Sequence, residues 1–201
     1  GLMVKFEAPE GATPIEDDGS LRIKGLTTYA ELSAAEAENI LKALRVHLGR
    51  RKNPKRQWFT EDFVRRVHRD MYGEVWTWAG EYRKTQTNIG VPSHLIVDEI
   101  GKLCGDVWYW DSNPACDIPI SERAVRIHHR MVQIHPFLNG NGRHARLMAD
   151  VYLHSHKQKL TQWPEDIGRR GEFRQRYIDS LRMADRGNIH PLIEYTKRYL
   201  A

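Results

Sequence analysis

Apolar residues recur at intervals of three and four along most of this chain after residue 27, a spacing typical of amphipathic helices. The first such stretch carries Leu32, Ala35, Ile40, Leu41, Leu44 and Leu48. It begins at a capping box, Thr28-x-x-Glu31, and stops at Gly49, so both ends of a helix over 28–49 are marked. The sequence therefore predicts that helices, and not a sheet, build the core.

Six further helices are predicted from the same pattern. They cover residues 60–72, 94–111, 121–134, 140–156, 168–185 and 190–200, with Ser121 as the expected N-cap of the fourth helix in the chain. Residues 1–27 are rich in Pro, Gly and Asp and have no sustained period, so we expect an extended arm on the surface.

The helical pattern breaks between residues 73 and 92. There β-branched residues alternate with polar ones at Thr85, Thr87, Ile89 and Val91, and the run closes at Gly90 and Pro92. This alternation indicates a short, exposed β-hairpin. The predicted fold class is all-α, with one hairpin and an N-terminal arm.

Composition excludes several classes of protein. A chain of 201 residues with 40% hydrophobic and 28% charged residues is neither collagen-like nor wholly disordered. No run approaches the ~18 apolar residues of a membrane span, and the N-terminus lacks the apolar core of a signal peptide. Two cysteines are too few for a disulfide framework. We therefore expect a cytoplasmic protein with no membrane partner.

The chain carries a formal net charge of +5, which favours anionic partners without naming one. Its most basic run, residues 50–56, follows the end of a predicted helix, where cations are favourable. Neither interleaved aromatic residues nor a helix-turn-helix pattern accompanies this run. We interpret it as a solvated loop and do not expect nucleic-acid binding.

The segment with most chemical information is HPFLNGNGRHAR at residues 135–146, between two predicted helices. Gly140 and Gly142 allow backbone N–H groups to converge, and the following helix presents its positive end there. Both features favour a bound phosphate, although glycines of this kind also form simple turns between helices.

Three side chains in the same segment can act on such a ligand. Arg143 and Arg146 are three residues apart and can hold successive phosphates, while His135 can take a proton near neutral pH. Taken singly, such arginines are more often a solvated face and such a histidine is more often structural. Their coincidence within a dozen residues favours a phosphate site.

Two competing motifs fail on context. The G-x-G-x-x-A pattern at 140–145 fits a relaxed dinucleotide fingerprint, but the residues before it have a helical and not a strand period. The histidines at 128–129 and 154–156 suggest zinc, yet no H-E-x-x-H occurs and the cysteines are badly spaced. Neither a Rossmann turn nor a zinc site is expected.

Residues 135–146 resemble the Fic family motif H-x-F-x-[D/E]-G-N-G-R-x-x-R at every specified position except the acidic one. The run AGEYRKTQTNIG at 79–90 resembles the flap hairpin of that family, and the order of helices is similar to its helical core. GATPI at 11–15 and ELSAAEAENI at 31–40 resemble the branch called mobile mystery protein B.

This resemblance implies a Fic-type helical bundle that transfers AMP from ATP to a Tyr, Thr or Ser hydroxyl of a target protein. It divides the chain into an arm over 1–27, a candidate inhibitory helix over 28–49 and a Fic domain over 50–201. His135 would be the general base, and Phe137 would anchor the loop. The residues implied in ATP binding are Asn139, Gly140, Asn141, Gly142, Arg143 and Arg146. Those implied in docking the target are Thr85, Gln86, Thr87, Asn88, Ile89 and Gly90.

Asn139 departs from the family pattern. The family usually places Asp or Glu there to hold Mg²⁺ on the ATP phosphates, and Asn139 supplies an amide oxygen without the charge. We expect weaker Mg²⁺ or Mn²⁺ binding, directly or through water, and altered or weakened activity. A related transferase with another phosphate-containing donor is therefore an alternative.

Many Fic proteins also carry an inhibitory pattern, [S/T]-x-x-x-E-[G/N], whose Glu pairs with the last Arg of the motif. Residues 34–39 match the Glu-Asn but have Ala34 in place of Ser or Thr. Glu38 is thus either an inhibitory partner of Arg146 or a polar position on an amphipathic helix. A third function, from another class, is a catalytically weak regulatory or toxin–antitoxin component. Whether the chain forms a homo-oligomer stays open.

Overall fold

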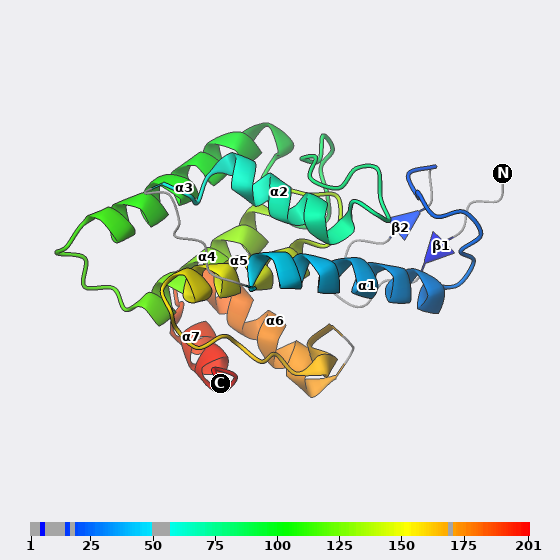
Figure 1. The fold of residues 1–201 in the computed structure, drawn as a ribbon. Coiled ribbons are helices and arrows are strands. Elements are labelled where there is room, and N and C mark those ends of the chain that lie inside the picture. Colours follow the sequence, from blue (N-terminus) through cyan, green and yellow to red (C-terminus); the bar gives the residue numbers. More distant parts are fainter. Residues whose placement is uncertain (1–4, 7–14, 17–18, 50–56, 169–170) are drawn as a thin grey trace.

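The computed structural model describes residues 5–6, 15–16, 19–49, 57–168 and 171–201. Over these residues it contains seven α-helices, two short 3-10 helices and one two-stranded sheet (Figure 1). The helices are α1 (Tyr29–His47), α2 (Glu61–Tyr72), η1 (Ser93–Leu95), α3 (Ile96–Ser112), α4 (Ile120–Ile134), α5 (Asn141–Ser155), η2 (Glu165–Gly168), α6 (Glu172–Asp185) and α7 (His190–Lys197). The predicted all-α fold is confirmed.

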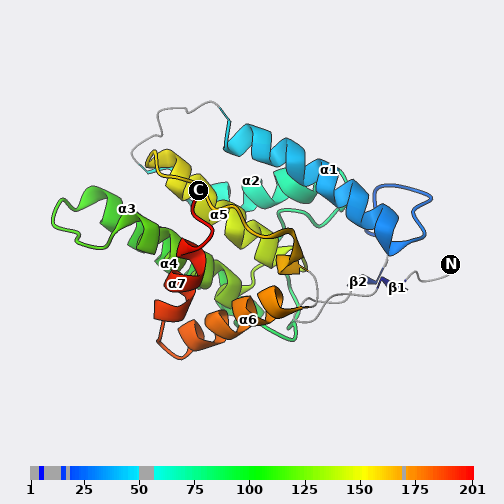
Figure 2. The ribbon, with the colours of Figure 1, turned by 90° about the horizontal axis from the view of Figure 1, so that it is seen from below.

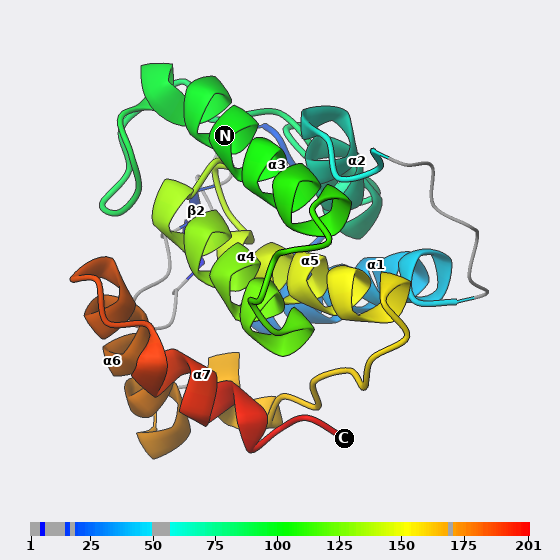
Figure 3. The same ribbon diagram turned by 90° about the vertical axis from the view of Figure 1, so that its left-hand side faces the viewer.

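Helix α5 is the centre of the molecule. It is buried around most of its circumference, which is typical of a core helix, and it packs on α4 and α2. Figure 3 shows α4 and α5 in the middle, with α2 and α3 on one side and α6 and α7 on the other. Figure 2 shows α1 beside α2, on the side of the molecule opposite α6. The start of α5 therefore lies among helices from both ends of the chain.

Helix α1 begins as the sequence predicts. The Thr28 side chain accepts from the Glu31 N–H, and the Glu31 carboxylate accepts from the Thr28 N–H, which completes the capping box. The buried face of α1 consists of Leu32, Glu36, Asn39 and Ala43. Their spacing of four, three and four is that of one helix face, so this face carries two polar side chains into the interior.

The predicted helix limits need small corrections. Helix α4 starts at Ile120 after Pro119, and Ser121 lies inside the first turn without capping it. Proline fixes its own φ near the helical value and restricts the residue before it, so Pro119 sets this start. At the other end of the chain α7 stops at Lys197, because Leu200 pairs instead with Thr161.

The predicted hairpin over residues 85–91 is not seen. These residues contain bends, and the bridge nearest to them joins Tyr82 to Phe137. Hydrogen bonds of the segment go to residues 134–136, with the Arg83 N–H donating to Pro136 O and the Val91 N–H to Ile134 O. Four alternating residues do not form a stable hairpin alone, and here the two ends of their segment are bonded to another part of the chain.

The N-terminal part contains pairing that the sequence did not predict. Strands β1 (Lys5–Phe6) and β2 (Ile15–Glu16) are antiparallel, with Lys5 opposite Glu16. Leu21 forms a bridge with Trp76, so residues just before α1 run along the turn after α2. The basic run at 50–56 lies outside the described residues. No described helix is both long and apolar enough to cross a membrane.

Candidate active site

The loop between α4 and α5 has a backbone that two residues in the left-handed region define. His135 has φ 52° and ψ 59°, and Gly140 has φ 78°. The Asn141 side chain closes the loop, since its Oδ1 accepts from the Phe137 N–H at 2.9 Å and its Nδ2 donates to Phe137 O at 2.8 Å. Asn141 was expected only as part of the phosphate nest, so its clamp on Phe137 is an additional role. Gly140, Asn141 and Gly142 stand at the N-terminus of α5, whose dipole favours an anion.

A buried histidine that sequence reasoning missed supports this loop from below. The ring of His68 on α2 stacks on Phe137 with 3.7 Å between centroids. Its Nε2 donates to Asn139 O at 2.9 Å and its Nδ1 accepts from the Gly80 N–H at 2.9 Å, which fixes the tautomer. Burial, with smaller effects from neighbouring charges, keeps the pKa of His68 well below its usual value. His68 is therefore a neutral link between three segments of the chain.

His135, the expected general base, is buried at the entrance to the loop. Burial, and next the charge of Arg83, lowers the pKa of its imidazole to about 4. The ring is neutral at pH 7 and can accept a proton, as a general base must.

Gly140 and Arg143 both lie against Tyr72, a buried side chain at the end of α2. A Cβ at position 140 would stand 2.5 Å from the Tyr72 ring, so the loop requires glycine there. The Arg143 guanidinium lies over the same ring, 5.1 Å from its centroid. Burial raises the pKa of Tyr72 to about 12, so this phenol stays protonated.

Arg143 also makes an ion pair that crosses to α1. Its Nη1 donates to Glu36 at 2.7 Å, and the other carboxylate oxygen of Glu36 accepts from the Trp76 indole at 2.8 Å. Glu36 is only 5% exposed. A buried carboxylate with two such partners is firmly held, so α1 contributes an acidic group to the first turn of α5.

The structure thus brings Glu36, and not Glu38, into contact with an arginine of this segment, and that arginine is Arg143 and not Arg146. Two residues turn a helix by about 200°, so Glu38 points away from the face that carries Glu36. Glu38 is exposed, and no contact between it and Arg146 is found among the described residues. The spacing of Leu32, Glu36 and Asn39 was the signal that could have identified Glu36 as the buried acid of this helix.

Arg146 turns toward α6 instead. Its Nη1 donates to the Tyr177 hydroxyl at 3.3 Å and its guanidinium lies 5.6 Å from the centre of that ring. The hydroxyl is 2.8 Å from Nε2 of His128. Burial, and next the charge of Arg146, lowers the pKa of His128 to about 3, so its ring is neutral at pH 7. The chain of hydrogen bonds runs from Arg146 through Tyr177 to His128.

The residues expected to dock a target run beside His135. Residues 85–90 are mostly exposed, and Gly90, with φ 105°, crosses the loop so closely that a Cβ would stand 2.7 Å from the His135 Cβ. From here on, the name flap denotes residues 84–91 only. The flap therefore lies against His135 without forming a hairpin.

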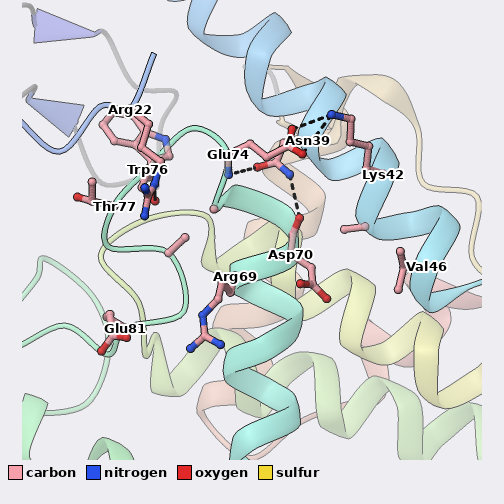
Figure 4. Close-up of a pocket in the computed structure, with 13 residues that line it drawn as sticks. Arg22, Asn39, Lys42, Val46, Arg69, Asp70, Glu74, Trp76, Thr77 and Glu81 are labelled. Carbon is pink, nitrogen blue, oxygen red and sulfur yellow. Dashed lines mark hydrogen bonds and ion pairs between the residues drawn. The ribbon is translucent and has the colours of Figure 1, made fainter. Parts of the chain in front are cut away.

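A pocket of about 540 Å³ is lined by residues of α1, of the end of α2 and of the turn that follows α2 (Figure 4). Asn39 lines this pocket. Its Nδ2 donates to Asp70 O at 2.9 Å and its Oδ1 accepts from the Glu74 N–H at 3.0 Å. Trp76, which holds Glu36, also lines this pocket. Asn39 thus fixes α1 to the end of α2 and helps to set the position of Glu36 one turn earlier.

The described residues do not fit a divalent metal held by protein alone. Asn139 Oδ1 accepts from the Gly140 N–H at 2.7 Å. Glu36 is engaged by Arg143, and no group of three or more His, Cys, Asp or Glu among the described residues could hold an ion. Metal ligands in this part of the chain would have to come mainly from a bound nucleotide.

The chain is similar to several known proteins. The Fic/DOC family profile matches residues 58–153. The chain is 31% identical to protein adenylyltransferase Fic of Nematostella vectensis over 147 residues, which are 72% of this chain and 33% of that protein. It is 30% identical to protein adenylyltransferase fic-1 of Caenorhabditis briggsae over 142 residues, 69% of this chain and 26% of that protein. The chain spans about a quarter to a third of these relatives.

Solved structures show the same fold. Fic-1 (residues 134–508) of C. elegans superposes with a TM-score of 0.69 at 23% identity, over 91% of this chain and 52% of that one. BepC of Bartonella tribocorum is a translocated effector protein that was crystallised with AMPPNP. It superposes with a TM-score of 0.68 at 16% identity, over 96% of this chain and 94% of that one. Residues 58–153, which the family profile matches, contain the loop with Arg143 and Arg146. The chain therefore belongs to the Fic/DOC family.

Proposed function

We propose that this protein is an adenylyltransferase that moves AMP from ATP to a Tyr, Thr or Ser hydroxyl of a target protein. One arrangement carries the proposal: a neutral His135 imidazole and the guanidinium groups of Arg143 and Arg146 come from a single loop and the first turns of the helix that follows it. The names of the relatives and the AMPPNP in the BepC structure support ATP as the donor.

The chemistry follows from these groups. His135 takes the proton of the target hydroxyl while the oxygen of that hydroxyl attacks the α-phosphorus of ATP. The bond from that phosphorus to the bridging oxygen breaks, and pyrophosphate leaves. The backbone of Gly140, Asn141 and Gly142 holds the α- and β-phosphates, and the two arginines neutralise the charge that develops on the leaving group.

The flap supplies the protein substrate in this proposal. Residues 85–90 are mostly exposed and lie beside His135, and their main chain would pair with an extended target segment, as in strand addition. Such pairing demands little of the target sequence and leaves the choice of Tyr, Thr or Ser to the geometry at the imidazole.

A second candidate function is favoured by Asn139. Its neutral amide oxygen faces Gly140 and lacks the charge that would attract Mg²⁺ or Mn²⁺ strongly, so a related transferase with another phosphate-containing donor fits the same loop. Comparison of several nucleotide donors by intact-mass shift separates the two functions.

We further propose that α1 inhibits the transfer through Glu36. Its carboxylate occupies Arg143, which would otherwise hold phosphate oxygens, and Trp76 keeps the carboxylate there. ATP must then displace Glu36 in order to bind Arg143.

We also propose that the chain belongs to the mobile mystery protein B branch, because residues 11–15 and 31–40 resemble it.

The test is incubation with labelled ATP, Mg²⁺ or Mn²⁺ and cell extract. We expect labelled polypeptides, with stronger labelling by Glu36→Gly and none by His135→Ala. Glu38→Gly is the matched control, since it places the same glycine on the exposed face of the same helix and should label like the parent. Equal labelling by His135→Ala would remove the mechanism. ATP binding without any mass shift in Glu36→Gly would instead favour the regulatory component.

A further inference from the structure

One buried guanidinium joins the flap to the end of α4. Arg83 is 5% exposed, and its Nε donates to His135 O at 2.6 Å while Nη2 donates to Ile134 O at 3.2 Å. The same group donates to the flap, from Nη1 to Thr85 O at 3.1 Å and from Nη2 to Val91 O. The planar fork of donors in arginine suits such simultaneous contacts to several carbonyl oxygens.

The backbone that Arg83 contacts is unusual. His135 is one of two non-glycine residues with positive φ among the described residues, and such a conformation persists only where its surroundings fix it. The carbonyl of His135 itself accepts a short bond of 2.6 Å from Arg83 Nε. The guanidinium therefore holds the general base in its left-handed conformation.

Gly90 provides a second, independent observation. A Cβ at this position would stand 2.7 Å from Arg83 Nη2 and 2.7 Å from the His135 Cβ. The flap main chain is thus in contact with both side chains at one point, where glycine leaves room for the approach.

We propose that Arg83 is a positioning residue, which sets the flap and His135 in one fixed relation so that a hydroxyl presented by the flap meets the imidazole. This inference rests on the proposed transfer function and adds to it a residue that touches neither nucleotide nor target. Displacement of a reacting group by about 1 Å can cost about 100-fold in rate, which is the size of effect expected when this relation is lost.

Arg123 is a matched control within the same chain. It is 8% exposed, and its guanidinium also donates to three main-chain carbonyls, those of Trp110, Cys116 and Ile118. The Trp110 carbonyl lies in the last turn of α3 and the other two lie between α3 and α4, outside the loop and the flap. A purely structural role for buried arginines would make the two alanine variants behave alike.

The activity experiment uses the Glu36→Gly protein as parent. We expect Arg83→Ala to lower the rate of AMP transfer about 100-fold while the ATP dissociation constant changes less than about twofold. Added guanidinium ion should restore about a tenth or more of the lost rate in Arg83→Ala, and Arg83→Lys should stay slow because an ammonium lacks the fork. Arg123→Ala should transfer AMP at the parental rate, with no response to guanidinium. Equal losses in ATP affinity and rate, or the same behaviour in both alanine variants, would overturn the proposal.

A second measurement does not depend on activity. Amide hydrogen exchange without nucleotide should become faster in peptides covering 84–91 and 132–138 of Arg83→Ala, and not in these peptides of Arg123→Ala. If the parent transfers no AMP but this exchange pattern appears, the transferase function fails and the coupling by Arg83 stands. If the parent transfers AMP and exchange in the two segments is unchanged, the coupling fails and the function stands.

Discussion

At the His135 end of the candidate site the loop is held by bonds to its main chain, whereas at the arginine end side chains contact other side chains. Asn141 bonds both main-chain groups of Phe137, and His68 bonds Asn139 O. At the other end Arg143 contacts Glu36 of α1, and Arg146 contacts a tyrosine of α6.

This difference separates the parts of the site that can rearrange from those that cannot. A main chain bonded on both faces has one geometry, and moving it breaks several hydrogen bonds together. Phosphate oxygens, in contrast, can offer Arg143 the same charge-assisted bond that the Glu36 carboxylate offers. We infer that the chemical step is fixed at the His135 end and that access is controlled at the arginine end.

The largest effect is expected where the fixed end is disturbed. Gly90→Ala places a Cβ 2.7 Å from the His135 Cβ at a φ of 105°, so the flap or the base must move. We expect AMP transfer to fall about 100-fold or more, with ATP affinity nearly unchanged. Gly101→Ala on α3 is the control, since its Cβ meets open space and alanine favours a helix. Parental activity in Gly90→Ala would show that the flap does not lie on His135.

The next effect concerns pH. The folded protein holds His68, His128, His135 and His144 with lowered pKa values, mainly because burial disfavours their charged forms. The unfolded chain binds these protons below about pH 6.5, so this stability is present above that pH and is lost as the pH falls. Each histidine should lower the free energy of unfolding by about 2 kcal/mol at pH 5. Asp150, whose pKa burial raises to about 6, opposes this with one proton.

Urea unfolding between pH 7 and pH 5 measures this effect. His128→Gln should flatten the slope below pH 6.5 by about 1.4 kcal/mol per pH unit, the value for one proton. Stability that does not change between pH 7 and pH 5 would contradict the buried, neutral state of these rings. Amide hydrogen exchange at pH 5 compares the two ends of the site directly. His68 bonds the loop main chain at Asn139, and His128 bonds the Tyr177 hydroxyl at the arginine end.

A smaller effect is expected at the arginine end. Glu36→Gln keeps an oxygen for the Trp76 indole and removes the charge that pairs with Arg143. We expect ATP to bind about tenfold more tightly, because it no longer competes with a carboxylate for that guanidinium. Calorimetric titration measures this, with Glu38→Gln on the exposed face as the unchanged control. The same ATP affinity in Glu36→Gln and the parent would exclude inhibition by this contact.

The smallest effect is expected at Tyr177. Tyr177→Phe keeps the ring beside Arg146 and removes the hydroxyl that orients its guanidinium. ATP affinity should fall about threefold, the size of one modest hydrogen bond. Tyr195→Phe removes a hydroxyl bond to Phe173 O in the same aromatic cluster and should leave ATP affinity unchanged. A loss of affinity in Tyr195→Phe of the same size would assign the effect to cluster packing.

Local patterns predicted much of the fold. The capping box at Thr28 marks a helix start that the structure confirms, because its bonds form within one turn. Thr60, where the second helix was expected to begin, is the N-cap of α2. The hairpin over 85–91 was wrong for the opposite reason. The Val91 N–H bonds to Ile134 O, and the carbonyls of Thr85 and Val91 accept from the Arg83 side chain; no pattern within the flap indicates those partners.

The sequence by itself determined which segments are helices and which chemical groups residues 135–146 carry, because both depend on neighbours within a few positions. Only the tertiary structure decided that Glu36 and not Glu38 meets an arginine, and that His68 and Arg83 hold the loop. These contacts join residues more than 50 positions apart, from Arg83 to His135 and from Glu36 to Arg143. Such distant pairs form only when helices pack, since packing selects which face of each helix is buried and therefore which polar groups must find partners there.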